Sequence, residues 1–114
     1  MIQKTPMDIL RELSPEGAEA YMQFRAATME DPRLQVLDMR QKLLIGVGVA
    51  AALQSSRCAL MWARQAVRAG VSPQEIVEAI LVSRLMKAAT VNDAAAETLD
   101  WLARGRETDP AADD

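Results

Sequence analysis

The chain offers few residues capable of chemistry, and the first of them is its single cysteine, Cys58. Cys58 follows Arg57 near the predicted start of a helix, where the helix dipole and the guanidinium would both favour a thiolate. A thiolate is the form of cysteine that attacks peroxides. Free cysteine is also among the most buried residue types in proteins. The sequence therefore leaves two interpretations open, a reactive thiol or a small buried hydrophobe.

Three arginines form a second candidate, because Arg57, Arg64 and Arg68 are spaced at seven and four residues. This spacing places them on one strip of a helix. Such a strip could bind an anion. It could also be a solvated face, or form salt bridges with acidic residues of a neighbouring subunit.

Other chemistry is excluded by residues that the chain lacks. It contains no histidine, which rules out Ser-His-Asp and Cys-His machinery, histidine metal sites and imidazole acid-base catalysis. With one cysteine, neither an intrachain disulfide nor a zinc cluster can form. We therefore predict no metal and no cofactor. The net charge of −3 gives no general attraction to nucleic acid or to anionic lipid, so neither is an expected partner.

The elements that position these residues are predicted to be helices. Half of the 114 residues are hydrophobic and 4% are aromatic, with five Gly and five Pro, which favours an all-α domain over a β-sandwich. We expect one domain over residues 1–105, followed by a disordered acidic tail over residues 106–114. Six helices are predicted, over about residues 6–13, 15–30, 36–53, 57–69, 73–87 and 91–103.

Two of these helices carry the clearest signals. Ser72 to Glu75 forms a capping box with Pro73 at the first helical position. The helix that follows is predicted to bury a stripe formed by Ile76, Val77, Ile80, Leu81, Leu85 and Met86. Residues 43–53 are apolar on every side, and such a helix lies inside a protein or an oligomer. This apolar run is too short to span a membrane, which needs roughly 18 residues or more. The first thirteen residues lack a secretory pattern, so we expect a cytoplasmic protein.

Residues 39–86 carry a set of ordered motifs. Arg40 to Ile45 leads into an alanine-rich helix, Ser55-Ser56-Arg57-Cys58 follows, and Gly70 to Ile76 begins another helix. The segment resembles the carboxymuconolactone decarboxylase and AhpD-like alkylhydroperoxidase family. That family has a Glu-Leu-Ile signature, a Cys-x-x-Cys turn, a histidine four residues after the second cysteine and a Gly-(Ala/Val)-(Thr/Ser)-x-x-Glu-Ile helix start. The spacing agrees throughout, which implies an AhpD-like helical fold.

The resemblance also implies a role for each aligned position, and most of these roles are lost here. The position of the family's first cysteine is Ser55, and that of the second, peroxide-reactive cysteine is Cys58. The relay glutamate falls on Leu43 and the relay histidine on Trp62. Leu43, Ser55 and Trp62 would then line an apolar pocket, which is either filled core or a site for a small apolar ligand.

We therefore expect a diverged family member that keeps the scaffold, lacks alkylhydroperoxidase activity and acts as a binding or structural module. The alternative is a one-cysteine thiol peroxidase, an antioxidant of the peroxiredoxin type, that uses Cys58 with an external thiol reductant. The resemblance implies a homo-oligomer, either a trimer or a hexamer. The apolar helices support assembly independently, because a domain of this size encloses few helices fully.

Overall fold

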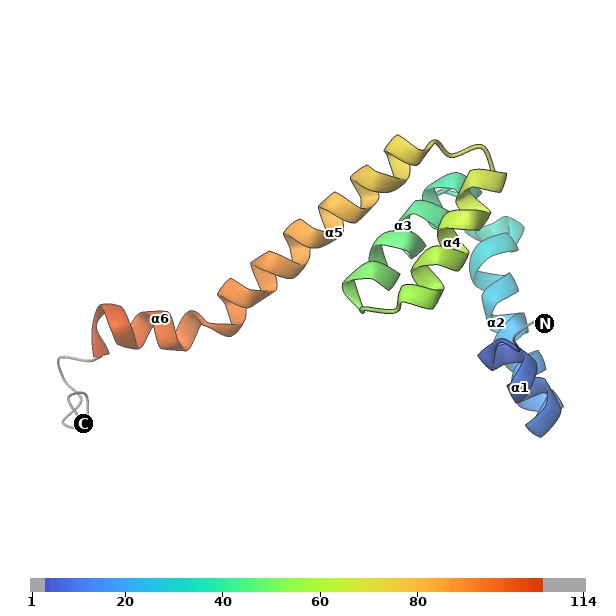
Figure 1. Cartoon of the computed structure of the whole chain (residues 1–114), viewed down its shortest axis with the longest axis horizontal. Helices are drawn as coiled ribbons and strands as arrows, with labels where there is room; N and C mark the ends of the chain where they lie inside the picture. Colours follow the sequence, from blue (N-terminus) through green and yellow to red (C-terminus); the bar gives the residue numbers. More distant parts are fainter. Residues whose placement is uncertain (1–3, 106–114) are drawn as a thin grey trace. The chain divides into compact units, whose positions relative to one another are not determined.

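The computed structural model describes residues 4–105, and this part of the chain folds into α-helices and one short 3-10 helix (Figure 1). The predicted all-α fold class is confirmed. The acidic tail predicted over residues 106–114 lies outside the described residues. The helices are α1 (Pro6–Leu13), α2 (Pro15–Glu30), η1 (Pro32–Leu34), α3 (Met39–Ala52), α4 (Ser56–Arg68), α5 (Pro73–Ala94) and α6 (Ala96–Ala103).

The chain divides into two compact units within α3, Met1–Leu43 and Leu44–Asp114. In the first unit, α1 packs against α2. A capping box starts α1: the Asp8 N–H donates to Thr5 Oγ1 at 3.1 Å, and the Thr5 N–H donates to the Asp8 carboxylate at 2.9 Å. The latter bond is the main reason that the pKa of Asp8 is lowered. Ser14 then accepts a hydrogen bond from the Gly17 N–H and caps α2.

The first unit also holds the beginning of α3 in place. Asp31 ends α2 and, through its carboxylate, caps η1 by accepting from the Arg33 N–H at 2.9 Å. The Lys42 ammonium donates to the carbonyl of Thr28 at 2.9 Å and to that of Leu34. These bonds connect α3 to the end of α2. The helix begins at Met39, later than predicted, because Asp38 caps it: the Gln41 N–H donates to the Asp38 carboxylate at 2.9 Å, and the Asp38 N–H donates to the Gln41 side-chain oxygen at 2.9 Å.

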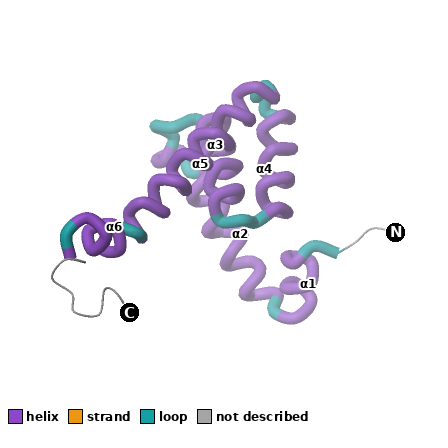
Figure 2. The backbone as a smooth tube through the Cα atoms, turned by 60° about the vertical axis from the view of Figure 1, so that its left-hand side comes forward, coloured by secondary structure: helices purple, strands orange, loops and turns teal. Residues whose placement is uncertain are grey.

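In the second unit, the rest of α3 and α4 run antiparallel and side by side (Figures 1 and 2). The turn between them contains Gln54, whose φ of 63° is positive. The Ser55 N–H donates to the Ala50 carbonyl at 2.9 Å and closes this turn. Val47 of α3 and Ala66 of α4 are buried, with 1% and 0% exposed. Both belong to the buried core of the chain.

Two expectations about the following helices are wrong. The predicted break at residues 88–90 is absent, and α5 continues to Ala94. The reason is local, because Ala88 and Ala89 favour helix. The Thr90 hydroxyl also finds a hydrogen-bond acceptor within the helix, since it donates to the Lys87 carbonyl at 2.6 Å. The predicted buried stripe of α5 is buried only at Ile76, whereas the following five members are exposed (Val77, Ile80, Leu81, Leu85 and Met86).

The start of α5 agrees with the sequence analysis. The Glu75 N–H donates to Ser72 Oγ at 3.2 Å, and the Ser72 N–H donates to the Glu75 carboxylate at 3.1 Å. Gly70, with a φ of +87°, makes the turn that precedes this capping box. The turn between α4 and α5 is therefore determined by two local features, Gly70 and the capping box.

Candidate functional site

The predicted reactive residue, Cys58, lies in the first turn of α4, the third residue of the helix. It is a free cysteine with an intermediate degree of exposure. The thiol is therefore neither enclosed in the core nor fully open to solvent. Its place in the first turn puts it near the unpaired backbone N–H groups of the helix start, where negative charge is favoured. Both interpretations of Cys58 are compatible with this position.

Ser55 stands at the N-cap of α4, but its side chain makes no capping hydrogen bond. Its backbone is used instead, because the Ser55 carbonyl accepts from the Ala59 N–H at 2.9 Å. Thr5, Ser14 and Ser72, by contrast, do cap their helices through their side chains. Ser55 is a hydroxyl at the aligned cysteine position, with no capping role.

Trp62 lies one turn after Cys58 on α4, and its indole packs on the backbone of α3 at Gly46. A Cβ atom built on Gly46 would come within 2.6 Å of Cζ3 and 2.8 Å of Cδ2 of the indole. Real Cβ atoms do not approach other atoms so closely. Only glycine can therefore stand opposite the ring. The position to which the resemblance assigns a relay histidine holds an aromatic ring in direct contact with the neighbouring helix.

Leu43, the position of the relay glutamate, is 3% exposed. It belongs to the first unit, and Trp62 belongs to the second. The aliphatic side chain of Leu43 has no group that could accept or donate a proton. The buried environment suits this side chain, and it would have opposed an ionised glutamate at the same position.

The arginine strip is placed by α4 as its spacing predicted. Arg57, Arg64 and Arg68 are all exposed, and no ion pair joins them to another residue of the described part. The sequence analysis missed what lies beside them, which is a set of exposed apolar side chains on the same outer side of α4: Leu60, Met61 and Val67. The signal was available, since residues 60, 61, 64, 67 and 68 share one side of a helix.

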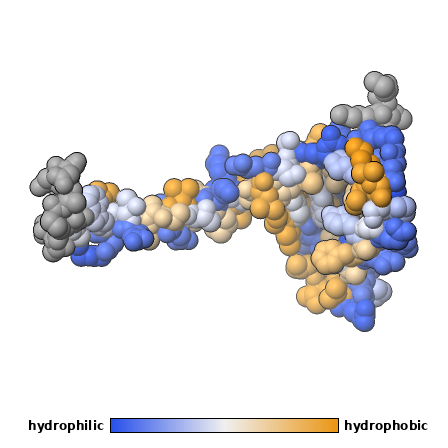
Figure 3. Space-filling view, turned by 90° about the horizontal axis from the view of Figure 1, so that it is seen from below, coloured by the Kyte–Doolittle hydropathy of each residue, from blue (hydrophilic) through white to orange (hydrophobic). Residues whose placement is uncertain are grey.

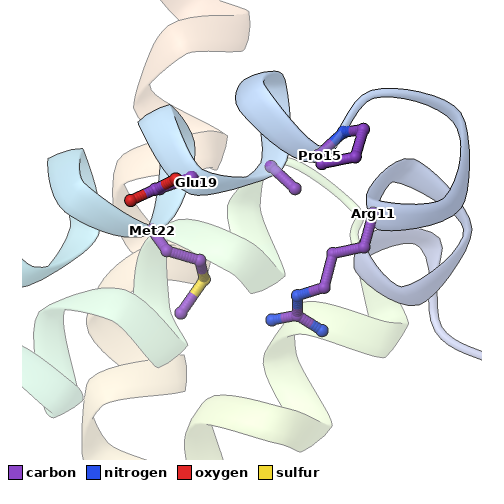
Figure 4. Close-up of a pocket in the computed structure, with 5 residues that line it drawn as sticks. Arg11, Pro15, Glu19 and Met22 are labelled. Carbon is purple, nitrogen blue, oxygen red and sulfur yellow. The ribbon is translucent and has the colours of Figure 1, made fainter.

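Hollows in the surface lie apart from these residues. A depression of about 350 Å³ lies between α1 and α2 and is lined by Arg11, Pro15, Ala18, Glu19 and Met22. Figure 4 shows Arg11 and Met22 reaching into it from the two helices. The Arg11 guanidinium is paired with Asp8 of its own helix at 3.2 Å. A second depression, lined by Pro73, Gln74, Val77 and Glu78, lies at the start of α5. Neither depression includes Cys58, Ser55 or Trp62 among its lining residues.

Metal chemistry finds no support in residues 4–105, because no group of three or more Cys, Asp or Glu side chains there could hold an ion. None of the helices in this range is both long and apolar enough to cross a membrane.

Comparisons with known proteins bear on the family and the fold of the chain. The model of the carboxymuconolactone decarboxylase family matches residues 15–101, well beyond the segment over which the motifs were recognised. The chain is also similar to a protein of known crystal structure from Methanobacterium thermoautotrophicum, with 32% sequence identity and a TM-score of 0.74. That similarity covers 81% of this chain and 97% of the other. No curated protein gives a comparable match.

Proposed function

Because the chain belongs to the carboxymuconolactone decarboxylase family, we propose that it uses the family's helical scaffold as a binding or structural module, without alkylhydroperoxidase activity. The proposal rests on the residues that stand where the family's chemistry would be. One thiol, Cys58, is kept, and the three other positions hold Leu43, Ser55 and Trp62.

The contact between Trp62 and Gly46 is the observation that carries this proposal. A proton relay needs a group that both accepts and donates a proton near neutral pH, as histidine does. The indole N–H can only donate a hydrogen bond. Its ring also occupies the space against α3, where even a methyl group on Gly46 would not fit. The position assigned to the relay histidine therefore holds a packed ring that cannot transfer a proton.

The chain also lacks a resolving thiol. Sulfenic acid formed at Cys58 normally condenses with a second thiol, and no other cysteine exists in the sequence. Ser55, at the aligned position, cannot form a disulfide. Any catalytic cycle would depend on a thiol from outside the chain.

That dependence defines the alternative function, a one-cysteine thiol peroxidase, which is favoured by the partial exposure of Cys58 beside Arg57. The Cys58 thiolate would attack the peroxide, breaking the O–O bond and releasing an alkoxide that takes a proton from water. The resulting sulfenic acid would then be reduced by two external thiols, which leave as a disulfide together with water.

We further propose that the protein is a homo-oligomer, a trimer or a hexamer by its resemblance to the family. The exposed apolar side chains of α5 and α6 support this proposal. A cytoplasmic location is a proposal that rests on the sequence analysis alone.

Consumption of an alkyl hydroperoxide, measured with excess dithiol for the wild type and for Cys58→Ser, tests the main proposal. We expect the two proteins to consume peroxide at the same slow rate, since losing acid-base help alone costs about 100- to 10,000-fold. A fast, saturable rate that disappears in Cys58→Ser would establish the one-cysteine peroxidase instead.

A further inference from the structure

A single residue, Ala95, separates α5 from α6, and these two helices of the second unit meet there at an angle (Figure 1). The φ of −91° and ψ of 1° at Ala95 lie outside the α-helical range. Ala95 nevertheless keeps helical hydrogen bonds on both sides. Its N–H donates to the Val91 carbonyl at 3.0 Å, and its carbonyl accepts from the Leu99 N–H at 2.8 Å. A rotation of about 40° in ψ would therefore bring Ala95 to the helical value and join the two helices.

The residues around this junction favour a continuous helix. Sharp bends in helices normally occur at proline, at glycine or serine, or at a π-bulge. Residues 88–104 contain no proline, glycine or serine, and Ala94, Ala95 and Ala96 are the strongest helix formers. No side chain caps the start of α6. The N–H groups that open α6 thus gain no partner from a cap, whereas a continuous helix would pair them.

The spacing of apolar residues also runs through the junction without a change of phase. Positions that alternate by four and three residues share one face of a continuous helix. Apolar side chains of α5 and α6 reach the surface, as Figure 3 shows for one side of the molecule. The face that passes from α5 through the junction into α6 is apolar except at one asparagine and consists of Leu81, Leu85, Ala88, Asn92, Ala95, Leu99 and Leu102.

Two carboxylates oppose the continuous form. Asp93, in the last turn of α5, and Glu97, in the first turn of α6, are four residues apart. In a continuous helix they would be neighbours, and like charges at this spacing destabilise a helix. The helix dipoles favour Glu97 at the start of α6 and disfavour Asp93 at the end of α5, so they cancel. The repulsion between the two carboxylates therefore opposes the helix propensity of the alanines.

We propose that Ala95 is a hinge, and that residues 73–103 exchange between the bent form and one continuous helix. The alanines and the unbroken apolar face favour the continuous form, and the repulsion between Asp93 and Glu97 favours the bend. Each contribution is small, so both forms are populated. The hinge sets the direction in which α6 presents its leucines relative to α5. This conformational device goes beyond the proposed function, because it involves none of the residues at the family's catalytic positions.

The distance between two spin labels, measured by pulsed electron-electron double resonance, tests the hinge in the full chain. The labels are attached through Arg84→Cys on α5 and Ala103→Cys on α6, both at exposed positions, in a Cys58→Ser background. A continuous helix places the two Cα atoms about 28 Å apart, at about 1.5 Å per residue, and the bend shortens this distance. Dilution with unlabelled Cys58→Ser protein restricts the signal to pairs within one chain.

Four variants of this labelled parent shift the equilibrium in defined directions. Glu97→Lys replaces the repulsion by an attraction, and Asp93→Lys with Glu97→Lys restores a like-charged pair. Ala95→Gly weakens the continuous helix at the hinge itself. Glu78→Lys, far from the hinge on α5, is the control that changes the net charge as Glu97→Lys does. Circular dichroism establishes that each variant is helical.

We expect two distances in the parent, and a ratio of the long to the short distance that rises at least about twofold in Glu97→Lys. The ratio should return to the parent value in the doubly charge-reversed variant, stay there in Glu78→Lys, and fall at least about twofold in Ala95→Gly. A single distance in the parent would overturn the hinge. Two distances whose ratio does not respond to Glu97→Lys, or does not return in the double variant, would overturn the balance of forces proposed for it.

Discussion

Two parts of the second unit differ in the burial of their apolar side chains. Between α3 and α4, the chain packs its own side chains to van der Waals contact, with Trp62 on Gly46 and Val47 buried. Along residues 84–103, side chains of the same kind are left exposed. In the first region, Trp62 stands at the position to which the resemblance assigns a relay histidine. In the second, several large apolar side chains are exposed, including Leu85 and Met86, and this exposure is one support for the proposed homo-oligomer.

The largest effect is expected from filling the space opposite Trp62. Gly46→Leu should destabilise the protein by about 3 kcal/mol, because the new side chain must displace the indole. Urea unfolding followed by circular dichroism measures the change. Trp62→Ala in the same chain should recover part of the loss. If Gly46→Leu were as stable as the wild type, the close contact would not exist in solution.

The next prediction compares a valine-to-alanine substitution in the buried region with the same substitution in exposed α5. Val47→Ala should cost about 2 kcal/mol, since it removes two buried methyl groups and leaves a small cavity. Val82→Ala, at a position 59% exposed, should change the stability of the dissociated chain by less than about 0.5 kcal/mol. Unfolding at low protein concentration measures both. Equal losses would mean that α5 is already covered within the chain.

A smaller effect is expected at the helix starts that lie between the two regions. Ser72→Ala should cost about 1 kcal/mol, because it removes the hydroxyl of the capping box that starts α5. Ser55→Ala, at the start of α4, should cost clearly less, since the Ser55 side chain makes no capping hydrogen bond. Thermal unfolding of the two variants side by side decides this. A greater loss for Ser55→Ala would show that this hydroxyl has a role that its geometry does not indicate.

The smallest effect concerns the exposed segment in the wild type. If a second copy covers it, the unfolding temperature should rise by a few degrees for each tenfold increase in protein concentration. Differential scanning calorimetry over two decades of concentration measures the rise. A constant unfolding temperature, together with a monomer mass, would show that no second copy covers the exposed segment.

The sequence predicted well those features that depend on neighbouring residues, above all the starts of helices. The starts of α1, α2 and α5 lie where Thr5, Ser14 and Ser72 placed them, because each of these side chains caps its own helix. The end of α5 was predicted seven residues too early, since nothing at residues 88–90 stops a helix. A weak break was inferred there without a glycine or a proline to make it.

The sequence predicted poorly those features that depend on residues far apart in the chain, namely burial and the contacts between helices. Periodicity showed that α5 has apolar side chains, but it does not say whether the same chain covers them, and only Ile76 is buried. The apolar residues 43–53 predicted an enclosed helix. The contact between Trp62 and Gly46 depends on how α3 and α4 pair. No local sequence pattern contains that information.

The most direct test of the central claim is the rate at which Cys58 reacts once with an alkyl hydroperoxide, because that step requires no reductant. Sulfenic acid at Cys58, trapped with dimedone and quantified by mass spectrometry against time, gives the second-order rate constant. With Trp62 and Leu43 at the relay positions, we predict a constant within about tenfold of that of free cysteine in the same buffer. A constant about 1,000-fold higher, lost when the protein is unfolded in urea, would contradict the claim that this site has lost its peroxidase chemistry.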